Sequence, residues 1–261
     1  MLLDNQPTAF DLRFRFLGFP VRVSPFFWLG MALFGQNWFQ KGIEFGLIWV
    51  ACGFASILVH ELGHALAMRR FGSSARIELF AFGGMAIASY TSPSAYRRMG
   101  IAAAGPAAGA TLLGIVYGTH YLTGWGATNA YTMAIYGALF MMNLFWTIFN
   151  LLPIWPFDGG HILRELLVVR NVRQPDFKTQ KISFVVALVL GIIGILMNFG
   201  SRDMVSNIAN SLPWWLLYVV PGPVMALFLL LLAYQSYEAM KLYSRPRLYN
   251  DDDRAPWRGR Q

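Results

Sequence analysis

The stretch Ile43–Met68, IEFGLIWVACGFASILVHELGHALAM, places His60, Glu61 and His64 in an apolar run that is long enough to cross a membrane. Ionisable residues in such a run are costly to bury, so their presence asks for a functional reason. On a helix, His60 and His64 project from one face one turn apart, the spacing at which two imidazoles can bind one metal ion. Glu61 then lies near the metal without having to ligate it. This arrangement is typical of zinc hydrolases, in which a carboxylate takes a proton from metal-bound water.

The composition indicates a membrane protein with several spanning segments. Of the 261 residues, 56% are hydrophobic and only 13% are charged, and the mean hydropathy is +0.45. The single cysteine, Cys52, excludes an intramolecular disulfide, and we expect it to be packed inside the membrane. No cleavable signal peptide is evident, so insertion should depend on the first transmembrane helix itself.

The apolar segments predict an α-helical polytopic membrane protein. About six transmembrane helices are expected, at 25–39, 43–68, 98–122, 130–152, 182–199 and 213–234. We divide the chain into a cytoplasmic N-terminal segment, 1–22, a membrane domain, 23–240, and a cytoplasmic tail, 241–261. In the first of these, arginines alternate with phenylalanines, which predicts an interfacial strand or an amphipathic anchor. Pro221-Gly222-Pro223 predicts a kink in the last helix, either static or the hinge of a lateral gate.

A small β-hairpin or sheet is expected between the second and third helices. Over residues 76–90, apolar residues alternate around Gly83-Gly84, a pair that permits the positive φ of a two-residue turn. We expect this hairpin either to hold an unwound substrate peptide by strand addition or only to cover the mouth of the site.

The distribution of positive charge supports this topology and argues against nucleic acid as a partner. Although the net charge is +8, 19 of the 21 Lys and Arg residues fall on one side of the six-helix topology. The two on the other side are Lys41 and Arg202. By the positive-inside rule the rich side is cytoplasmic. Both termini are therefore expected in the cytoplasm, with the active site near the cytoplasmic face of a bacterial-type inner membrane.

A catalytic zinc ion takes three protein ligands and leaves the fourth position to water, so a third ligand is needed. Asp158 is the candidate. It lies where two prolines and the pair Gly159-Gly160 break the chain at the level of His60 and His64. Broken backbone at membrane depth is tolerated only where it is buried or lines a cavity. His161 is the rival ligand, and Asp158 is preferred because the flanking residues suit an inward turn of its carboxylate.

On these residues the sequence resembles the site-2 protease family of intramembrane zinc metalloproteases. The resemblance covers roughly residues 20–200, and it rests on His60-Glu61-Leu62-Gly63-His64, on Asn150-x-x-Pro153 to Asp158-Gly159-Gly160, and on Gly105-Pro106. It implies one Zn²⁺ per chain, bound by His60, His64 and Asp158, with Glu61 as the catalytic base. It also implies that Asn150 lies near the bound substrate, a hydrophobic or transmembrane peptide.

Two departures from the family pattern matter here. Phe157 precedes Asp158 where the family commonly has leucine, which is a conservative change. The sequence shows no peptide-binding insertion and no nucleotide-sensing domain, so it resembles the compact branch typified by sporulation-factor proteases. The regulator of that branch cannot be carried over.

The expected function is hydrolysis of peptide bonds in or near transmembrane segments, in regulated intramembrane proteolysis or in clearing signal-peptide remnants. The candidate substrate-binding residues are Asn150, Gly83, Gly84 and Pro153. Two alternatives stay open for them: Asn150 can form a helix–helix hydrogen bond, and the hairpin that carries Gly83 and Gly84 can only cover the cytoplasmic mouth. The alternative functions are a metal-binding transporter or sensor, and an inactive scaffold for transmembrane segments. The expected partners are a transmembrane substrate, membrane lipid, and a regulatory membrane protein or a second copy of this chain.

Overall fold

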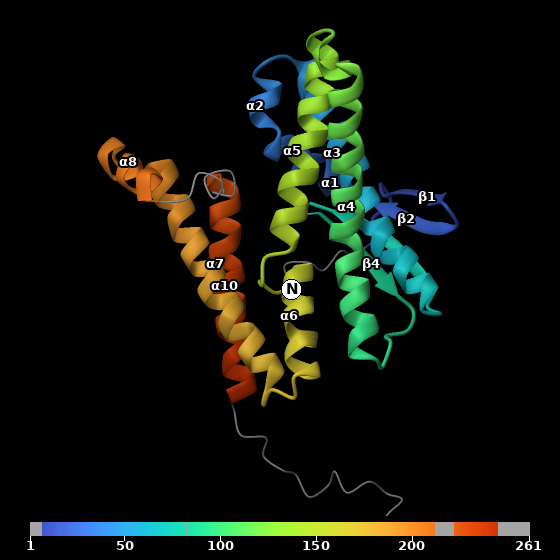
Figure 1. Ribbon diagram of the computed structural model, residues 1–261, viewed down its shortest axis with the longest axis vertical. Coiled ribbons are helices and arrows are strands. Elements are labelled where there is room, and N and C mark those ends of the chain that lie inside the picture. Colours follow the sequence, from blue (N-terminus) through green and yellow to red (C-terminus); the bar gives the residue numbers. More distant parts are fainter. Residues whose placement is uncertain (1–6, 82, 212–221, 245–261) are drawn as a thin grey trace, which may run out of the picture.

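The computed structural model describes residues 7–81, 83–211 and 222–244. In these residues the chain forms a bundle of long helices, with a small sheet on one side and a helix pair on the other (Figure 1). The elements follow in the order β1 (Leu12–Phe16), β2 (Phe19–Val23), α1 (Pro25–Phe34), α2 (Gln36–Phe39), α3 (Ile43–Arg70), β3 (Ala75–Phe80), β4 (Gly83–Ala88), α4 (Ala95–Thr123), η1 (Trp125–Ala127), α5 (Ala130–Asn150), α6 (Asp158–Val169), α7 (Pro175–Phe199), α8 (Arg202–Ser211) and α10 (Pro223–Ser244).

The predicted fold class is confirmed, with one helix fewer than expected among the described residues. Five helices there are long and apolar enough to cross a membrane: α3, α4, α5, α7 and α10. The predicted first span, 25–39, is wrong as a single helix, because the chain breaks at Gly35 into α1 and α2. A Cβ atom at Gly35 would overlap the indole of Trp49 on α3, so a glycine is needed where the end of α1 passes α3. The ten residues of α1 rise only about 15 Å, half of a bilayer core.

The predicted sixth span, 213–234, is tested only in part, since residues 213–221 lie outside the described residues. Helix α10 continues to Ser244, ten residues beyond the predicted end. Pro221 is also outside the described residues, whereas Pro223 is the first residue of α10, a position where proline is tolerated.

The sheet has four strands in the order β1-β2-β3-β4, so β1 and β4 are its edges. Strands β1 and β2 pair antiparallel, as do β3 and β4, while β2 and β3 are parallel. The predicted hairpin at 76–90 is present, but its turn was misplaced. Gly83 and Gly84 belong to β4, where they pair with Phe80 and Leu79. The strand prediction for the N-terminal segment holds for β1 and β2, which join the same sheet.

One face of the sheet packs on helices α1 and α3. Alternate residues of β2 and β3 are buried, and Val23, Ile77 and Leu79 have no exposed surface. These residues pack with Phe27 of α1 and Ile57 of α3 in the main hydrophobic core. The period-two burial pattern is what a half-buried strand requires.

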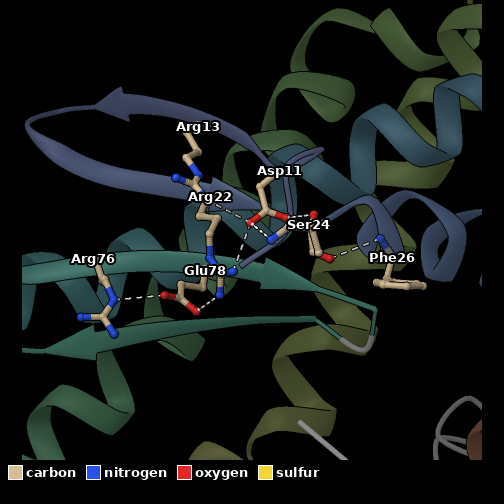
Figure 2. Close-up of polar contacts among 8 residues, drawn as sticks. Asp11, Arg13, Arg22, Ser24, Phe26, Arg76 and Glu78 are labelled. Carbon is tan, nitrogen blue, oxygen red and sulfur yellow. Dashed lines mark hydrogen bonds and ion pairs between the residues drawn. The ribbon is translucent and has the colours of Figure 1, made fainter. Parts of the chain in front are cut away.

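The opposite face of the sheet carries an ion-pair network that holds the N-terminal segment in place (Figure 2). Arg22 on β2 lies between two carboxylates, 3.2 Å from Asp11 and 2.5 Å from Glu78 of β3. Burial by itself raises the pKa of Glu78, but the hydrogen bonds from Arg22 and Arg76 outweigh it and lower the pKa. Nearby, the Ser24 side chain accepts a hydrogen bond from Phe26 N–H and caps helix α1, so the sheet leads directly into the bundle.

Candidate metal centre

The two predicted histidine ligands lie on α3 in the interior of the bundle. His60 and His64 are 2% and 7% exposed, and Glu61 is 4% exposed. The one-turn spacing sets the Nε2 atoms of the two imidazoles 3.3 Å apart. Both histidines therefore present the same ring nitrogen to one point in space.

Asp158 reaches this point from the first residue of α6. Its Oδ2 lies 3.1 Å from Nε2 of His60, and its Oδ1 lies 3.2 Å from Nε2 of His64. The two glycines that follow make this approach possible. A Cβ atom at Gly159 would overlap the carbonyl oxygens of Leu151 and Leu152, just after α5, and one at Gly160 would lie 2.7 Å from the carbonyl of Ile154. The Asp-Gly-Gly sequence thus lets α6 start tightly against the preceding loop, with its carboxylate facing α3.

These three side chains fit a tetrahedral zinc ion. In the described part of the chain, they are the one group of His, Cys, Asp or Glu side chains placed to hold a metal, with donor atoms within 4.8 Å of one another. Zinc bonds of about 2.0–2.1 Å at tetrahedral angles separate two ligand atoms by about 3.4 Å. The two Nε2 atoms, 3.3 Å apart, match this value, and each of them lies 3.1–3.2 Å from a different oxygen of Asp158. Three ligands would leave one position open.

Helix α4 fixes the orientation of His64. A Cβ atom at Gly105 would overlap the imidazole of His64, so the ring lies directly on the backbone of α4. The Nδ1 atom of His64 is 2.7 Å from the carbonyl oxygen of Ile101. Pro106 removes one backbone donor from this turn of α4 and disturbs its hydrogen-bond ladder. The glycine of Gly105-Pro106 therefore serves close packing, and it does so against a predicted metal ligand.

Strand β4 covers Glu61 from the other side. A Cβ atom at Gly84 would lie 2.5 Å from Cγ and 2.8 Å from Oε1 of Glu61. At Gly83 it would lie 2.7 Å from the indole of Trp146, whose ring stands edge-on to His60 at 6.5 Å. Of the two glycines predicted to bind substrate, Gly84 thus lies against the predicted base and Gly83 against Trp146, on an edge strand.

The other predicted substrate residues surround the start of α6. The side-chain amide of Asn150 donates to the carbonyl of Trp146 within its own helix, at 2.9 Å. Pro153 lies in the loop between α5 and α6, where its carbonyl accepts from Ser183 of α7 at 3.4 Å. A role of Asn150 and Pro153 in binding substrate stays a prediction. His161, the rival ligand, packs its ring on Trp155 at 4.1 Å and is not in the metal group.

Helix α6 is held in place by ion pairs to its neighbours. Glu165 is 2.6 Å from Arg98 of α4 and 2.6 Å from Arg164, which in turn is 2.6 Å from Asp176 of α7. Burial raises the pKa of Glu165, but the hydrogen bonds and charges of Arg98 and Arg164 outweigh it and lower the pKa. The helix that carries Asp158 is therefore tied to both halves of the bundle.

Sequence reasoning missed three groups beside the site: the carbonyl of Ile101, Trp146 and Thr147. A backbone carbonyl leaves no mark in a sequence. A signal did exist on α5, where Asn143, Thr147 and Asn150 fall four and three residues apart and so share one helix face. Asn143 uses this face to donate to Ser56 of α3 at 2.9 Å.

Known proteins are similar to this chain in sequence and in fold. Residues 124–194 match the family model described as peptidase family M50. A candidate zinc metalloprotease of Synechocystis is 34% identical over 164 residues, 58% of this chain and 42% of the relative. The candidate zinc metalloprotease Rip3 of Mycobacterium tuberculosis is 33% identical over 169 residues, 63% of this chain and 42% of the relative. A zinc metalloprotease of Methanocaldococcus jannaschii is 27% identical over 194 residues, 74% of this chain and 55% of the relative.

The chain thus spans about two fifths to just over half of the length of these curated relatives. Among solved structures, a site-2 protease from Methanocaldococcus jannaschii superimposes with a TM-score of 0.54. That match covers 87% of this chain and 95% of the other at 21% identity, and it shows a common fold. With five helices able to span a bilayer, the chain is an integral membrane protein. Its residues 124–194 match peptidase family M50, and its fold is that of a site-2 protease.

Proposed function

We propose that this chain is a zinc-dependent intramembrane endopeptidase that hydrolyses peptide bonds in or near transmembrane segments. The observation that carries the proposal is the convergence of His60, His64 and Asp158 on one point, with donor atoms within 4.8 Å, beside a buried glutamate on a membrane-spanning helix. The names of the matched relatives, zinc metalloproteases, support it.

The chemistry divides between the metal and Glu61. A bound zinc ion supplies Lewis acidity, which makes water a competent nucleophile near neutral pH and polarises a peptide carbonyl. Glu61 accepts the proton from the attacking water and passes it to the nitrogen of the leaving amine. Its position suits this role, because it follows His60 directly and stays outside the metal group. Its low exposure keeps bulk water away from the carboxylate.

The substrate we propose is a transmembrane peptide that has been unwound at the cleavage site, because a helix hides its amides in internal hydrogen bonds. Strand β4 is an edge strand, so it can pair with an extended peptide by strand addition. Gly83 and Gly84 would then set that peptide beside Glu61, with Asn150 and Pro153 on its other side. Proline substitutions on β4 should impair cleavage. If such variants cleaved both the native substrate and an already unfolded peptide as well as wild type does, strand addition would be contradicted.

We also propose that both termini face the cytoplasm and that the site opens toward that side. Figure 1 supports an alternating topology, because α2 and α8 both lie toward the upper end of the view; Lys41 follows α2 by two residues and Arg202 is the first residue of α8. The proposed membrane is the bacterial-type inner membrane, and the proposed pathways are regulated proteolysis or clearance of signal-peptide remnants. Membrane lipid and a regulatory membrane protein or second copy are the further partners.

The test uses purified protein in detergent, with zinc content and cleavage of transmembrane peptides as the two measurements. Glu61→Gln should keep the zinc and lose the cleavage, whereas Glu44→Gln, at the start of the same helix, should keep both. Equal cleavage by wild type and Glu61→Gln would contradict the proposal. Zinc without cleavage by any protein would point to the sensor, transporter or scaffold.

A further inference from the structure

The two metal-site histidines differ in what their second ring nitrogen contacts. Nδ1 of His64 has the carbonyl of Ile101 at 2.7 Å. Nδ1 of His60 is buried and has no hydrogen-bond partner among the described protein groups. A metal-bound histidine almost always donates this second N–H to an acceptor, which fixes the ring and its tautomer. A centre built like this one should therefore provide an acceptor for His60.

Thr147 on α5 carries an equally unusual hydroxyl. Its Oγ1 is buried without a partner among the described protein groups, and the residue is 9% exposed. Threonines inside helices commonly donate to the carbonyl four residues earlier. Thr111, Thr123 and Thr179 of this chain all do so, at 2.7–2.9 Å. The Thr147 hydroxyl makes no such bond, so it remains available for another group.

Gly109 of α4 shows that the two atoms face the same place. A Cβ atom there would lie 2.7 Å from Oγ1 of Thr147 and 3.8 Å from Nδ1 of His60. The glycine leaves room between α3, α4 and α5 where the donor and the acceptor can meet. Both atoms are otherwise desolvated, and leaving a buried polar group without a partner is unfavourable.

From this geometry we propose that Thr147 is a positioning residue for the metal centre. Its Oγ1 accepts the hydrogen bond from Nδ1–H of His60, directly or through one water molecule, and so turns the Nε2 lone pair toward the metal. Gly109 keeps the space for this contact open. Helix α5 thus does for His60 what the α4 backbone does for His64.

The test measures zinc affinity by competition with a chromophoric chelator, in detergent and without any assay of proteolysis. Thr147→Val removes the hydroxyl while keeping the shape, and it should weaken zinc binding about 10–100-fold. Thr147→Ser keeps the hydroxyl and should bind zinc within a few-fold of wild type. Thr111→Val, on the outer face of α4, is the matched control and should change nothing. Gly109→Ala should weaken zinc binding as Thr147→Val does.

Unchanged zinc affinity in Thr147→Val, or equal losses in Thr147→Val and Thr147→Ser, would overturn the inference. Thr147→Ala carries the same expectation and replaces the valine variant if that variant does not fold. The inference rests on the metal binding of the proposed function. Absence of zinc from wild type would therefore end both, whereas a wild-type affinity in Thr147→Val would end this one alone.

Discussion

The two hydrophobic clusters of this protein pack by different means. The first, between the sheet, α1 and α3, adjoins a buried polar interior, where backbone glycines of α4 and β4 press directly on His64 and Glu61. The second joins α7 and α10 through Ala187, Leu229 and neighbouring apolar residues. A backbone pressed on a ring leaves no freedom to adjust, whereas leucine side chains can change rotamer. The comparison indicates that the first region fixes geometry and that the second provides a more tolerant support.

Removal of Asp158, the predicted metal-binding side chain between the two regions, should have the largest effect. Asp158→Ala should weaken zinc binding by more than about 100-fold, since even the loss of an outer hydrogen bond to a metal ligand costs about 10–100-fold. Metal analysis after dialysis measures this. Asp203→Ala, on the exposed face of α8, should bind zinc as wild type does. Retained zinc in Asp158→Ala would shift the third ligand to another side chain.

Within the first region, a single added methyl group should disturb the site. Gly105→Ala would overlap the His64 ring, and we expect a loss of about 1–3 kcal/mol in stability together with weaker zinc binding. Gly114→Ala is the matched control on the same helix, because nothing lies within 4 Å of its added carbon. It should leave zinc binding unchanged and raise stability by up to about 1 kcal/mol. Thermal unfolding and zinc titration distinguish the two variants.

In the second region the same kind of substitution should cost less. Gly191→Ala on α7 would bring its Cβ to 2.7 Å from Cδ2 and 2.8 Å from Cγ of Leu230, a flexible side chain, and to 3.3 Å from the carbonyl oxygen of Ala226. We expect a loss below about 1 kcal/mol and unchanged zinc affinity. A loss as large as that of Gly105→Ala would remove the contrast between the regions.

Acid should weaken the ion pairs of Glu165 that hold α6 in the bundle, and this effect should be smaller. The pKa of Glu165 is lowered in the folded protein from its usual 4.5, so the folded state favours the ionised form. The stabilisation that ionised Glu165 gives the folded state is present above pH 4.5. It is lost as the pH falls from 4.5 through the lowered pKa of Glu165 in the folded protein. Melting temperatures between pH 7 and pH 3 should therefore fall less steeply for Glu165→Gln than for wild type. Parallel curves would show that this ion pair does not support α6.

Much of the fold could be predicted from the sequence, because the membrane constrains each segment separately. A run of about twenty apolar residues must form a helix, so α3, α4 and α5 were predicted within a few residues. Where the constraint weakens, the predictions failed: the chain at 25–39 breaks at Gly35, and the Gly83-Gly84 turn became a strand. At Gly35 and Gly83 an aromatic ring from a distant helix occupies the place of a Cβ atom, which the local sequence does not reveal.

For the candidate site, the sequence alone determined the chemical groups. Two histidines one turn apart, the adjacent glutamate and an Asp-Gly-Gly break are local patterns with a fixed geometry. Only the tertiary structure decided what surrounds them: β4 on Glu61, the Ile101 carbonyl on His64, and Thr147 facing His60 across Gly109. Those contacts join segments about 20–90 residues apart, and they depend on how closely backbones approach. In the sequence, the only sign of such close approaches is the glycines that permit them.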